Sequence, residues 1–174
     1  MRIFGRNINL LHVFFYFLIF FRSLKYITPH KFIYYYCLRK SPKNILINKK
    51  LMIHFSQHPH DFITFVVIFL KKEYGNIPSN HTIIDIGANI GLFSIYAFLN
   101  SKNNYIISFE PSLDAFKILK KNIDLNNLNK SIKIFNGTIS SKKEKKIEFP
   151  KKSSPYNQIE NSYNEETKTV NNFN

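Results

Sequence analysis

Thr82-Ile83-Ile84-Asp85-Ile86-Gly87-Ala88-Asn89-Ile90-Gly91-Leu92-Phe93-Ser94 is the stretch that decides the fold of this 174-residue chain. Its first five residues form a β-branched run around one acid, which is typical of a parallel strand buried on both faces. Gly87 and Gly91 then allow a sharp turn and a close approach to a ligand, and Asn89 tolerates an unusual backbone angle. The apolar residues after Gly91 have helical spacing. We therefore predict strand, turn and helix, with a small-molecule site at the turn.

The same pattern continues downstream. A second apolar strand, Tyr105 to Phe109, ends at Glu110, and Pro111 and Ser112 introduce a second helix. A third strand, Ile132 to Phe135, leads into Asn136-Gly137-Thr138. Strands that alternate with helices predict right-handed crossovers and a parallel sheet that binds ligands at the carboxyl ends of its strands. The expected fold class is α/β, a doubly wound parallel sheet.

The turn predicts which ligand the site binds. A dinucleotide fingerprint would place glycines where this chain has Asn89 and Leu92, so a nicotinamide-dependent enzyme is disfavoured. Asp85 beside the turn suits a cationic ligand, such as an ammonium near a sulfonium. Glu110 ends the next strand, where an acid accepts hydrogen bonds from ribose hydroxyls. This combination favours S-adenosylmethionine over a nicotinamide dinucleotide.

Three segments together resemble the FkbM family of class I methyltransferases: Ile84 to Ser94, Phe109 to Ser112, and Leu119 to Asn127. The resemblance covers about Thr82 to Phe149. It implies a Rossmann-like domain that uses S-adenosylmethionine to methylate a hydroxyl of a glycan or secondary metabolite.

The resemblance also implies the donor-binding residues. Asp85 to Gly91 would hold the methionine part, Glu110 the ribose, and Asn136 to Thr138 the adenine edge. The implied cofactor-binding set is Asp85, Gly87, Ala88, Asn89, Gly91, Glu110 and Thr138. No catalytic residue is assigned, because a general base and the acceptor contacts would come from strands that this pattern lacks.

The sequence after the third strand does not continue the methyltransferase pattern, so only the N-terminal half of the domain is expected, in a truncated or degenerate chain. The strand at Thr82 would then have an unpaired edge, which favours aggregation unless other strands, another chain or a missing portion covers it. A non-catalytic, membrane-associated remnant or interaction protein is therefore the alternative function.

Residues 1–27 contain the apolar run Leu10 to Phe21 with Arg or Lys on both sides. As a helix this run would be about 18 Å long, shorter than the roughly 30 Å hydrocarbon core of a bilayer. It is expected either to lie in a membrane interface or to pack on the main domain, and a short signal anchor is the minority interpretation. No small-residue cleavage site follows the run.

Residues 28–80 are expected to form short strands at Phe32 to Tyr36, Ile45 to Ile47 and Leu51 to Phe55, followed by a covering helix that Asp61 caps. His54, His58, His60 and Asp61 match no metal signature, so we interpret the histidines as surface or packing residues and predict no metal. Residues 81–149 would be the partial methyltransferase domain. Residues 150–174 are nearly all polar, which predicts a disordered tail.

Lys and Arg number 25 against 11 Asp and Glu, giving a formal charge of +14. The lysines are scattered without an aromatic nucleic-acid-binding signature, so nucleic acid is disfavoured as a partner. Cys37 is the single cysteine, which favours a reducing compartment. The expected location is cytoplasmic, with membrane association as the alternative.

Overall fold

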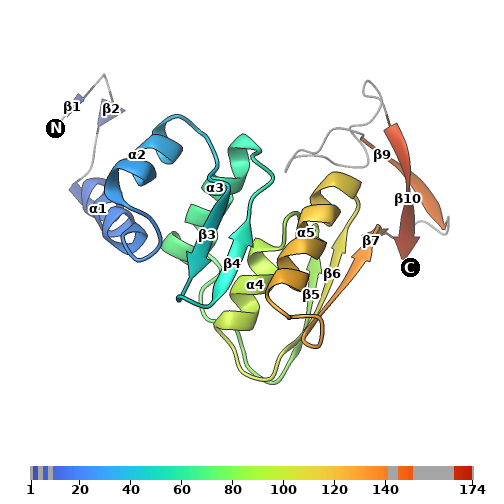
Figure 1. Ribbon diagram of the computed structural model, residues 1–174. Helices are drawn as coiled ribbons and strands as arrows, with labels where there is room; N and C mark the ends of the chain where they lie inside the picture. The colour runs from blue at the N-terminus through green and yellow to red at the C-terminus, as the bar shows by residue number, and fades with distance from the viewer. Residues whose placement is uncertain (1, 4–5, 8–9, 141–144, 151–166, 174) are drawn as a thin grey trace.

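The computed structural model describes residues 2–3, 6–7, 10–140, 145–150 and 167–173. Helices lie at the N-terminal end of the molecule, a parallel sheet with two helices lies in the centre, and a small sheet lies at the opposite end (Figure 1). The first elements, β1 (Arg2–Ile3) and β2 (Arg6–Asn7), are two-residue strands that pair with each other.

The central sheet consists of β5 (Thr82–Ile86), β6 (Tyr105–Glu110) and β7 (Ile132–Asn136), parallel and in the order β5-β6-β7. Helix α4 (Leu92–Leu99) connects the first pair and α5 (Leu113–Leu125) the second. Asp85 pairs with Ser108 and Glu110 with Asn136, so the strands end close together. The predicted α/β fold with a parallel sheet is confirmed.

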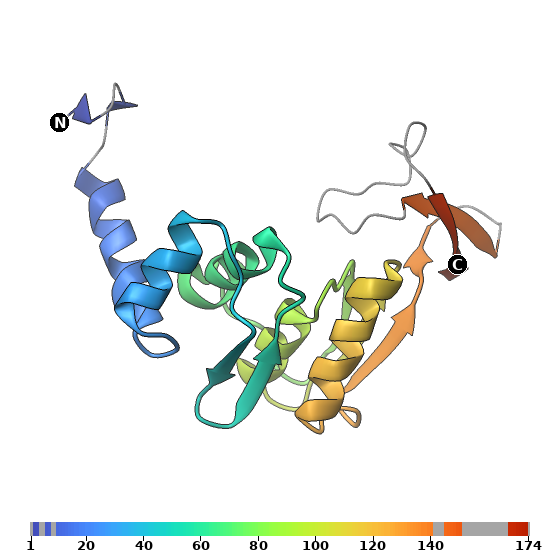
Figure 2. The ribbon, with the colours of Figure 1, turned by 45° about the horizontal axis from the view of Figure 1, so that its top comes forward.

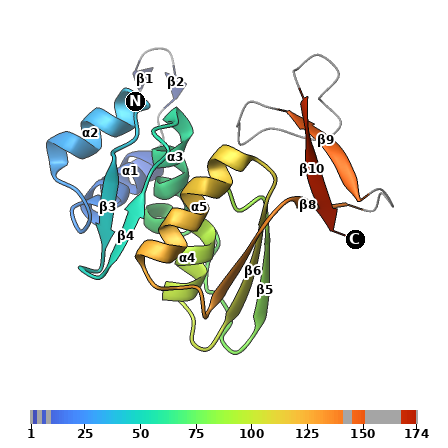
Figure 3. The ribbon, with the colours of Figure 1, turned by 45° about the vertical axis from the view of Figure 1, so that its right-hand side comes forward.

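Helices cover one face of this sheet. Both α4 and α5 lie on the same side (Figure 3), because two right-handed crossovers in the same direction place their helices together. Ile106 and Ile132 are buried beneath them. On the opposite face Ile84 and Ile86 are 58% and 60% exposed. The expectation that this strand is buried on both faces is therefore wrong for the part of the chain that the structure describes.

Helices α1 (Leu10–Ser23) and α2 (Pro29–Cys37) form the N-terminal end. The prediction of a strand at Phe32 to Tyr36 is wrong. Pro29 fits the first turn of a helix, and the rings of Phe32 and Tyr36 stack at 5.4 Å across one helical turn. Stacking between Phe32 and Tyr36 along the helix therefore outweighs the general preference of aromatic residues for strands. None of the helices among the described residues has the length and apolar character needed to cross a bilayer.

A β-hairpin follows, as predicted. Strand β3 (Asn44–Ile47) pairs antiparallel with β4 (Leu51–His54) through a turn in which Asn48 and Lys49 have positive φ. The hairpin forms its own sheet and does not pair with the edge of β5. The described residues contain no strand that covers that edge.

Two asparagines of α5 attach the hairpin to the central domain. Asn122 accepts from the His54 N–H at 2.7 Å and donates to the His54 carbonyl at 2.9 Å, and Asn126 binds the N–H and carbonyl of Met52 in the same way. Each side-chain amide thus satisfies the backbone N–H and carbonyl of one residue at the edge of β4. The two asparagines are four residues apart, which places both side chains on one face of α5. Hydrogen bonds from two side chains of α5 to the backbone of β4 therefore join the hairpin to this helix.

The next helix begins as α3 (Pro59–Phe65) and continues as a π-helical segment, η1 (Val66–Lys71). Its N-cap is His58, so the prediction that Asp61 caps it is wrong. The Asp61 carboxylate instead accepts hydrogen bonds from the backbone and hydroxyl of Ser56. The helix packs on α4, where Phe69 meets Tyr96, and on α1.

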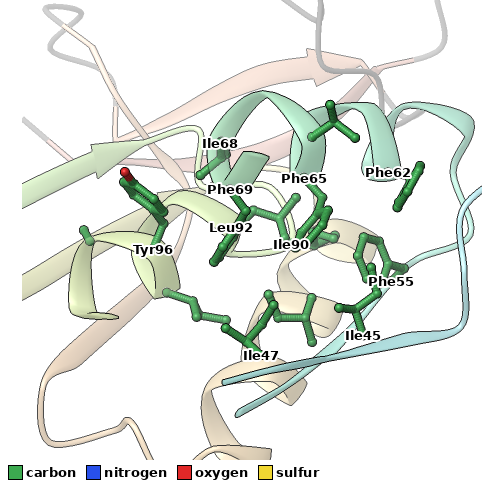
Figure 4. Close-up of a cluster of buried hydrophobic side chains, with 14 of the residues drawn as sticks. Ile45, Ile47, Phe55, Phe62, Phe65, Ile68, Phe69, Ile90, Leu92 and Tyr96 are labelled. Atoms are coloured by element: carbon green, nitrogen blue, oxygen red, sulfur yellow. The ribbon is translucent and has the colours of Figure 1, made fainter. Parts of the chain in front are cut away.

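This helix provides much of the hydrophobic core. Phe62, Phe65 and Phe69 lie along one side of it, with Phe55 and the hairpin isoleucines opposite and Ile90 and Leu92 at the boundary with the sheet (Figure 4). The core is continuous from the hairpin to α4. The N-terminal extension and the central sheet therefore share one core.

The chain after β7 forms β8 (Thr138–Ile139), β9 (Lys146–Pro150) and β10 (Thr167–Phe173), with β10 between the other two. The prediction of disorder is therefore wrong for residues 167–173, while residues 151–166 lie outside the described residues. Phe173 contacts Phe109 and Phe135 on the open face of the sheet, and Val170 is buried. These two apolar residues in a polar segment explain the strand.

Asn122→Ala tests the attachment of the hairpin. The change removes the partners of one half-buried N–H and two carbonyls, so the free energy of unfolding should fall by about 1–3 kcal/mol. Hydrogen exchange at the His54 amide should accelerate. The control on the same helix is Lys117→Ala, at an exposed ion pair, which should change stability by less than about 0.5 kcal/mol. Unchanged exchange at His54 in the Asn122 variant would contradict the attachment.

Candidate functional site

The turn between β5 and α4 lies at the carboxyl end of the sheet. Gly87, Asn89 and Gly91 all have positive φ, at 82°, 50° and 87°. The N–H groups of Gly87 and Ala88 both donate to the Phe109 carbonyl, at 2.9 and 3.0 Å. The turn is therefore fastened to the end of β6.

The two glycines of the turn have different roles. A Cβ at Gly91 would come within 2.6 Å of the buried Leu119 side chain, whereas a Cβ at Gly87 would meet nothing within 4 Å. Gly91 thus allows α4 and α5 to pack closely. Gly87 supplies a backbone angle and leaves open space beside the turn.

Glu110 joins the two strand ends. One carboxylate oxygen accepts from the Asn89 N–H and the other from the Ser112 N–H, both at 2.7 Å. The side chain is buried. Glu110 therefore holds both the turn before α4 and the start of α5, in addition to the ribose contact predicted for it, which stays a prediction.

Asp85 is buried on the helix-covered face of the sheet. Its carboxylate accepts a hydrogen bond from the Ser94 hydroxyl, which also contacts the Ser108 hydroxyl at 2.9 Å. Burial raises the pKa of Asp85 above its ordinary value, and the hydrogen bond from Ser94 opposes this only in part. No described cation forms an ion pair with it.

The predicted adenine edge adjoins Glu110. Asn136 Nδ2 and the Gly137 N–H both donate to the Glu110 carbonyl, at 2.8 and 3.1 Å. Thr138 is buried in β8 beside β10. A Cβ at Gly137 would come within 2.5 Å of the Asn171 carbonyl and the Phe173 ring. The C-terminal strand therefore lies directly against this edge.

Residues that the sequence analysis did not select also shape the site. Asn122 donates to the Ile90 carbonyl at 2.9 Å, which links the turn to α5 and the hairpin. Ser112 Oγ is buried without a hydrogen-bond partner among the described residues. The signal for Asn122 was its four-residue spacing from Asn126 in a helix, where asparagine is a poor helix former. Ser112 had no distinct signal beyond its place before a helix.

A cavity of about 340 Å³ lies beside the turn. Asn89 contributes to its wall from the turn and Asp114 from α5, while Ser56 and His58 precede α3 and Asp61 lies in its first turn. Burial raises the pKa of Asp61, against hydrogen bonds from Ser56 that lower it. The N-terminal extension and the predicted donor turn thus share one concave surface.

The histidines have separate structural roles. His58 caps α3 and lines the cavity, with its Nδ1 accepting from the His60 N–H. His54 contacts Asn44 and Lys121 on the surface. Among the residues that the structure describes, no group of three or more His, Cys, Asp or Glu side chains is arranged to hold a metal.

Comparison with known families supports a methyltransferase. Residues 72–149 match the family model of the TRM5/TYW2 methyltransferase domain. This segment contains β5 to β7, the turn and Glu110. The matched model is not that of the FkbM family, so the comparison supports the methyltransferase part of the resemblance and not the FkbM assignment.

Two curated relatives are similar over part of the chain. "Methyltransferase sdnD" of Sordaria araneosa is 38% identical over 69 residues, covering 40% of this chain and 27% of the relative. "Methyltransferase 1" of Beauveria bassiana is 33% identical over 63 residues, covering 35% and 25%. The chain therefore aligns with about a quarter of the length of each relative.

A solved structure, that of a transferase candidate from Pyrococcus horikoshii, aligns with a TM-score of 0.35 and 23% identity. The alignment covers 53% of this chain and 31% of that one. This likeness is too slight to carry an argument, and the fold rests on the observed strand order and crossovers.

Comparing Gly91→Ala with Gly87→Ala tests their different roles. Both variants place alanine at positive φ, which costs about 1–2 kcal/mol. Only Gly91→Ala also forces a methyl group against Leu119, which adds about 1–3 kcal/mol. Urea denaturation should rank the Gly91 variant as less stable by that difference, and equal midpoints would disprove the close packing.

Asp85→Asn tests the buried acid. The folded-state pKa lies above the ordinary 3.8, so ionisation costs stability as pH rises from near 3.8 through the raised pKa. Asparagine keeps an oxygen for Ser94 and has no charge to bury. The unfolding free energy of the variant minus that of the wild type should therefore increase as pH rises above about 4, and level off above the raised pKa of Asp85. The raised pKa of Asp61 is common to both proteins and cancels. A difference that does not vary with pH would contradict the buried carboxylate.

Proposed function

We propose that this chain binds S-adenosylmethionine at the turn of residues 87–91 and serves an FkbM-type methyltransferase that acts on a hydroxyl of a glycan or secondary metabolite. The observation that carries the proposal is the fastening of this turn to Glu110 at the ends of two parallel strands. The match of residues 72–149 to a methyltransferase domain supports the same activity.

The residues present fit the donor. Open space beside Gly87 leaves room for a ligand at the end of β5. A carboxylate offers about four acceptor positions, so the two backbone bonds of Glu110 are compatible with its accepting from ribose hydroxyls while it holds the turn. The Ser112 hydroxyl, which is buried without a hydrogen-bond partner among the described residues, adds a polar group beside Glu110.

The donor supplies a methyl group on a positively charged sulfonium, and this chain would supply positioning. In-line transfer gains most of its rate from holding the two reactants in the correct orientation. The turn and Glu110 would fix the donor, and the cavity beside Asn89 would face the acceptor side. Transfer to a hydroxyl also requires a base for its proton, and we assign none.

The two relatives are named as methyltransferases, and this chain aligns with about a quarter of the length of each. Donor binding is therefore the part of the proposal that can be measured directly on this chain. The competing interpretation as a nicotinamide enzyme is disfavoured by Asn89, which directs its N–H to Glu110 instead of a pyrophosphate. Donor binding alone does not separate an active enzyme from a non-catalytic remnant that has kept the turn, whereas a remnant that has lost the site would not bind the donor.

Titration calorimetry with S-adenosylhomocysteine and its 2′,3′-dideoxy analogue separates these roles. Wild-type protein should bind the first in the micromolar range and the analogue about 1–3 kcal/mol more weakly, because the analogue lacks the hydroxyls that Glu110 would accept from. Glu110→Gln should bind both ligands about equally. NADH should not compete.

Glu73→Gln is the matched control, because Glu73 is an exposed glutamate that pairs with Lys71 and is not part of the turn. It should behave as wild type with both ligands. Thermal unfolding checks that the Glu110 variant keeps its fold. Equal affinity of wild-type protein for the two ligands would exclude the ribose contact, and no binding of S-adenosylhomocysteine to folded protein would exclude the donor site.

A further inference from the structure

Helix α1 presents an apolar stripe to solvent. Phe14, Phe17 and Phe21 are 61%, 58% and 51% exposed and recur at the spacing of one helix face, with Leu18 and Leu24 beside them. Exposed apolar patches of this kind mark interaction surfaces. The helix lies at the end of the molecule away from the sheet (Figure 2).

The opposite face of α1 holds the helix to the protein. Ile19 and Ser23 are buried, and Arg22 Nη1 donates to the Leu70 carbonyl of η1 at 2.7 Å. The orientation of the stripe is therefore set by packing. A helix that rests on its own protein along one side and exposes aromatic rings on the other suits a planar surface better than a span across a bilayer.

A basic cavity adjoins the stripe. The turn between α1 and α2 and the start of β3 border an open cavity of about 830 Å³, lined by Lys25, Lys31 and Lys43 together with Tyr26 and Leu24. No acidic residue lines it among the described residues. Leu24 belongs to both the stripe and the cavity, so the two features are continuous.

Charge indicates which partner fits this surface. The first 60 residues contain no Asp or Glu, and Asp61 is the first acid of the chain. Their basic residues are Arg2, Arg6, Arg22, Lys25, Lys31, Arg39, Lys40, Lys43, Lys49 and Lys50. Two such surfaces would repel each other, which disfavours a second copy as the partner. An anionic surface with an apolar interior complements both features.

We propose that α1 and the α1–α2 turn form an interfacial anchor for anionic lipid membranes. The aromatic stripe enters the boundary between headgroups and acyl chains, and the cavity of three lysines receives anionic headgroups. At 14 residues α1 is about 21 Å long, which suits a helix that lies in the plane of the interface. The anchor would hold the predicted donor site near a membrane surface.

Vesicle flotation of the full chain tests the anchor. Wild-type protein should float with phosphatidylcholine vesicles that contain about 30% phosphatidylglycerol, and roughly tenfold less with phosphatidylcholine alone. The combined variant Phe14→Ser, Phe17→Ser and Phe21→Ser should lose roughly tenfold of its binding to the anionic vesicles. The variant Lys25→Gln, Lys31→Gln and Lys43→Gln should lose the preference for anionic lipid.

The matched control is Ile84→Ser with Ile86→Ser, which removes equally exposed apolar residues from the sheet. This control should float as wild type. Circular dichroism checks that every variant is folded. Failure of folded wild-type protein to float, or an equal loss in the control, would overturn the proposal. So would a dimer, detected by light scattering, that the phenylalanine variant dissociates.

A tryptophan reporter gives an independent measurement, because the chain contains no Trp. Emission from Phe17→Trp should shift to the blue with anionic vesicles, and brominated lipids should quench it. Leu125→Trp, at an exposed position on α5, should show neither effect. Equal responses from the two reporters would contradict insertion through α1.

Discussion

The carboxylate of Glu110 is the interaction on which the candidate site depends. One buried side chain accepts from the backbone before α4 and the backbone before α5, so it fixes the starts of both helices relative to the ends of β5 and β6. Bonds from backbone N–H groups to a carboxylate are strong and directional. The positive φ angles of the turn are thus held by a partner, and a ligand would meet a turn that is already shaped.

The N-terminal extension is coupled to this turn through Asn122. Its single amide bonds to the His54 backbone in the hairpin and to the Ile90 carbonyl in the turn. Because the phenylalanines of α3 and η1 pack between the hairpin and α4, the two regions also share their apolar core. A cavity with walls from both regions is the consequence, and the extension is therefore structurally part of the site.

Sequence patterns predicted the elements whose signals were local. The β-branched run, the two glycines and the acid at the end of β6 identified the sheet and its turn, since parallel strands and tight turns have strong residue preferences. The prediction of a strand at Phe32 to Tyr36 was wrong because aromatic residues favour strands in general, whereas here Phe32 and Tyr36 stack along a helix. The cap of α3 and the strand β10 were missed because tertiary partners decide both: Ser56 binds Asp61, and the open sheet face receives Phe173.

The face of the central sheet opposite α4 and α5 is covered only in part. Parallel sheets are normally covered on both sides, because their strands are apolar throughout. Here α4 and α5 cover one side, and on the other side Phe173 contacts Phe109 of β6 and Phe135 of β7. Ile84 and Ile86 on β5 remain in solvent, next to a strand edge without a described partner. The same strand also carries the donor turn at its end. A group that covered this face would therefore contact the strand that leads into Gly87, on the side away from α4 and α5, while Glu110 and the Phe109 carbonyl hold the turn itself.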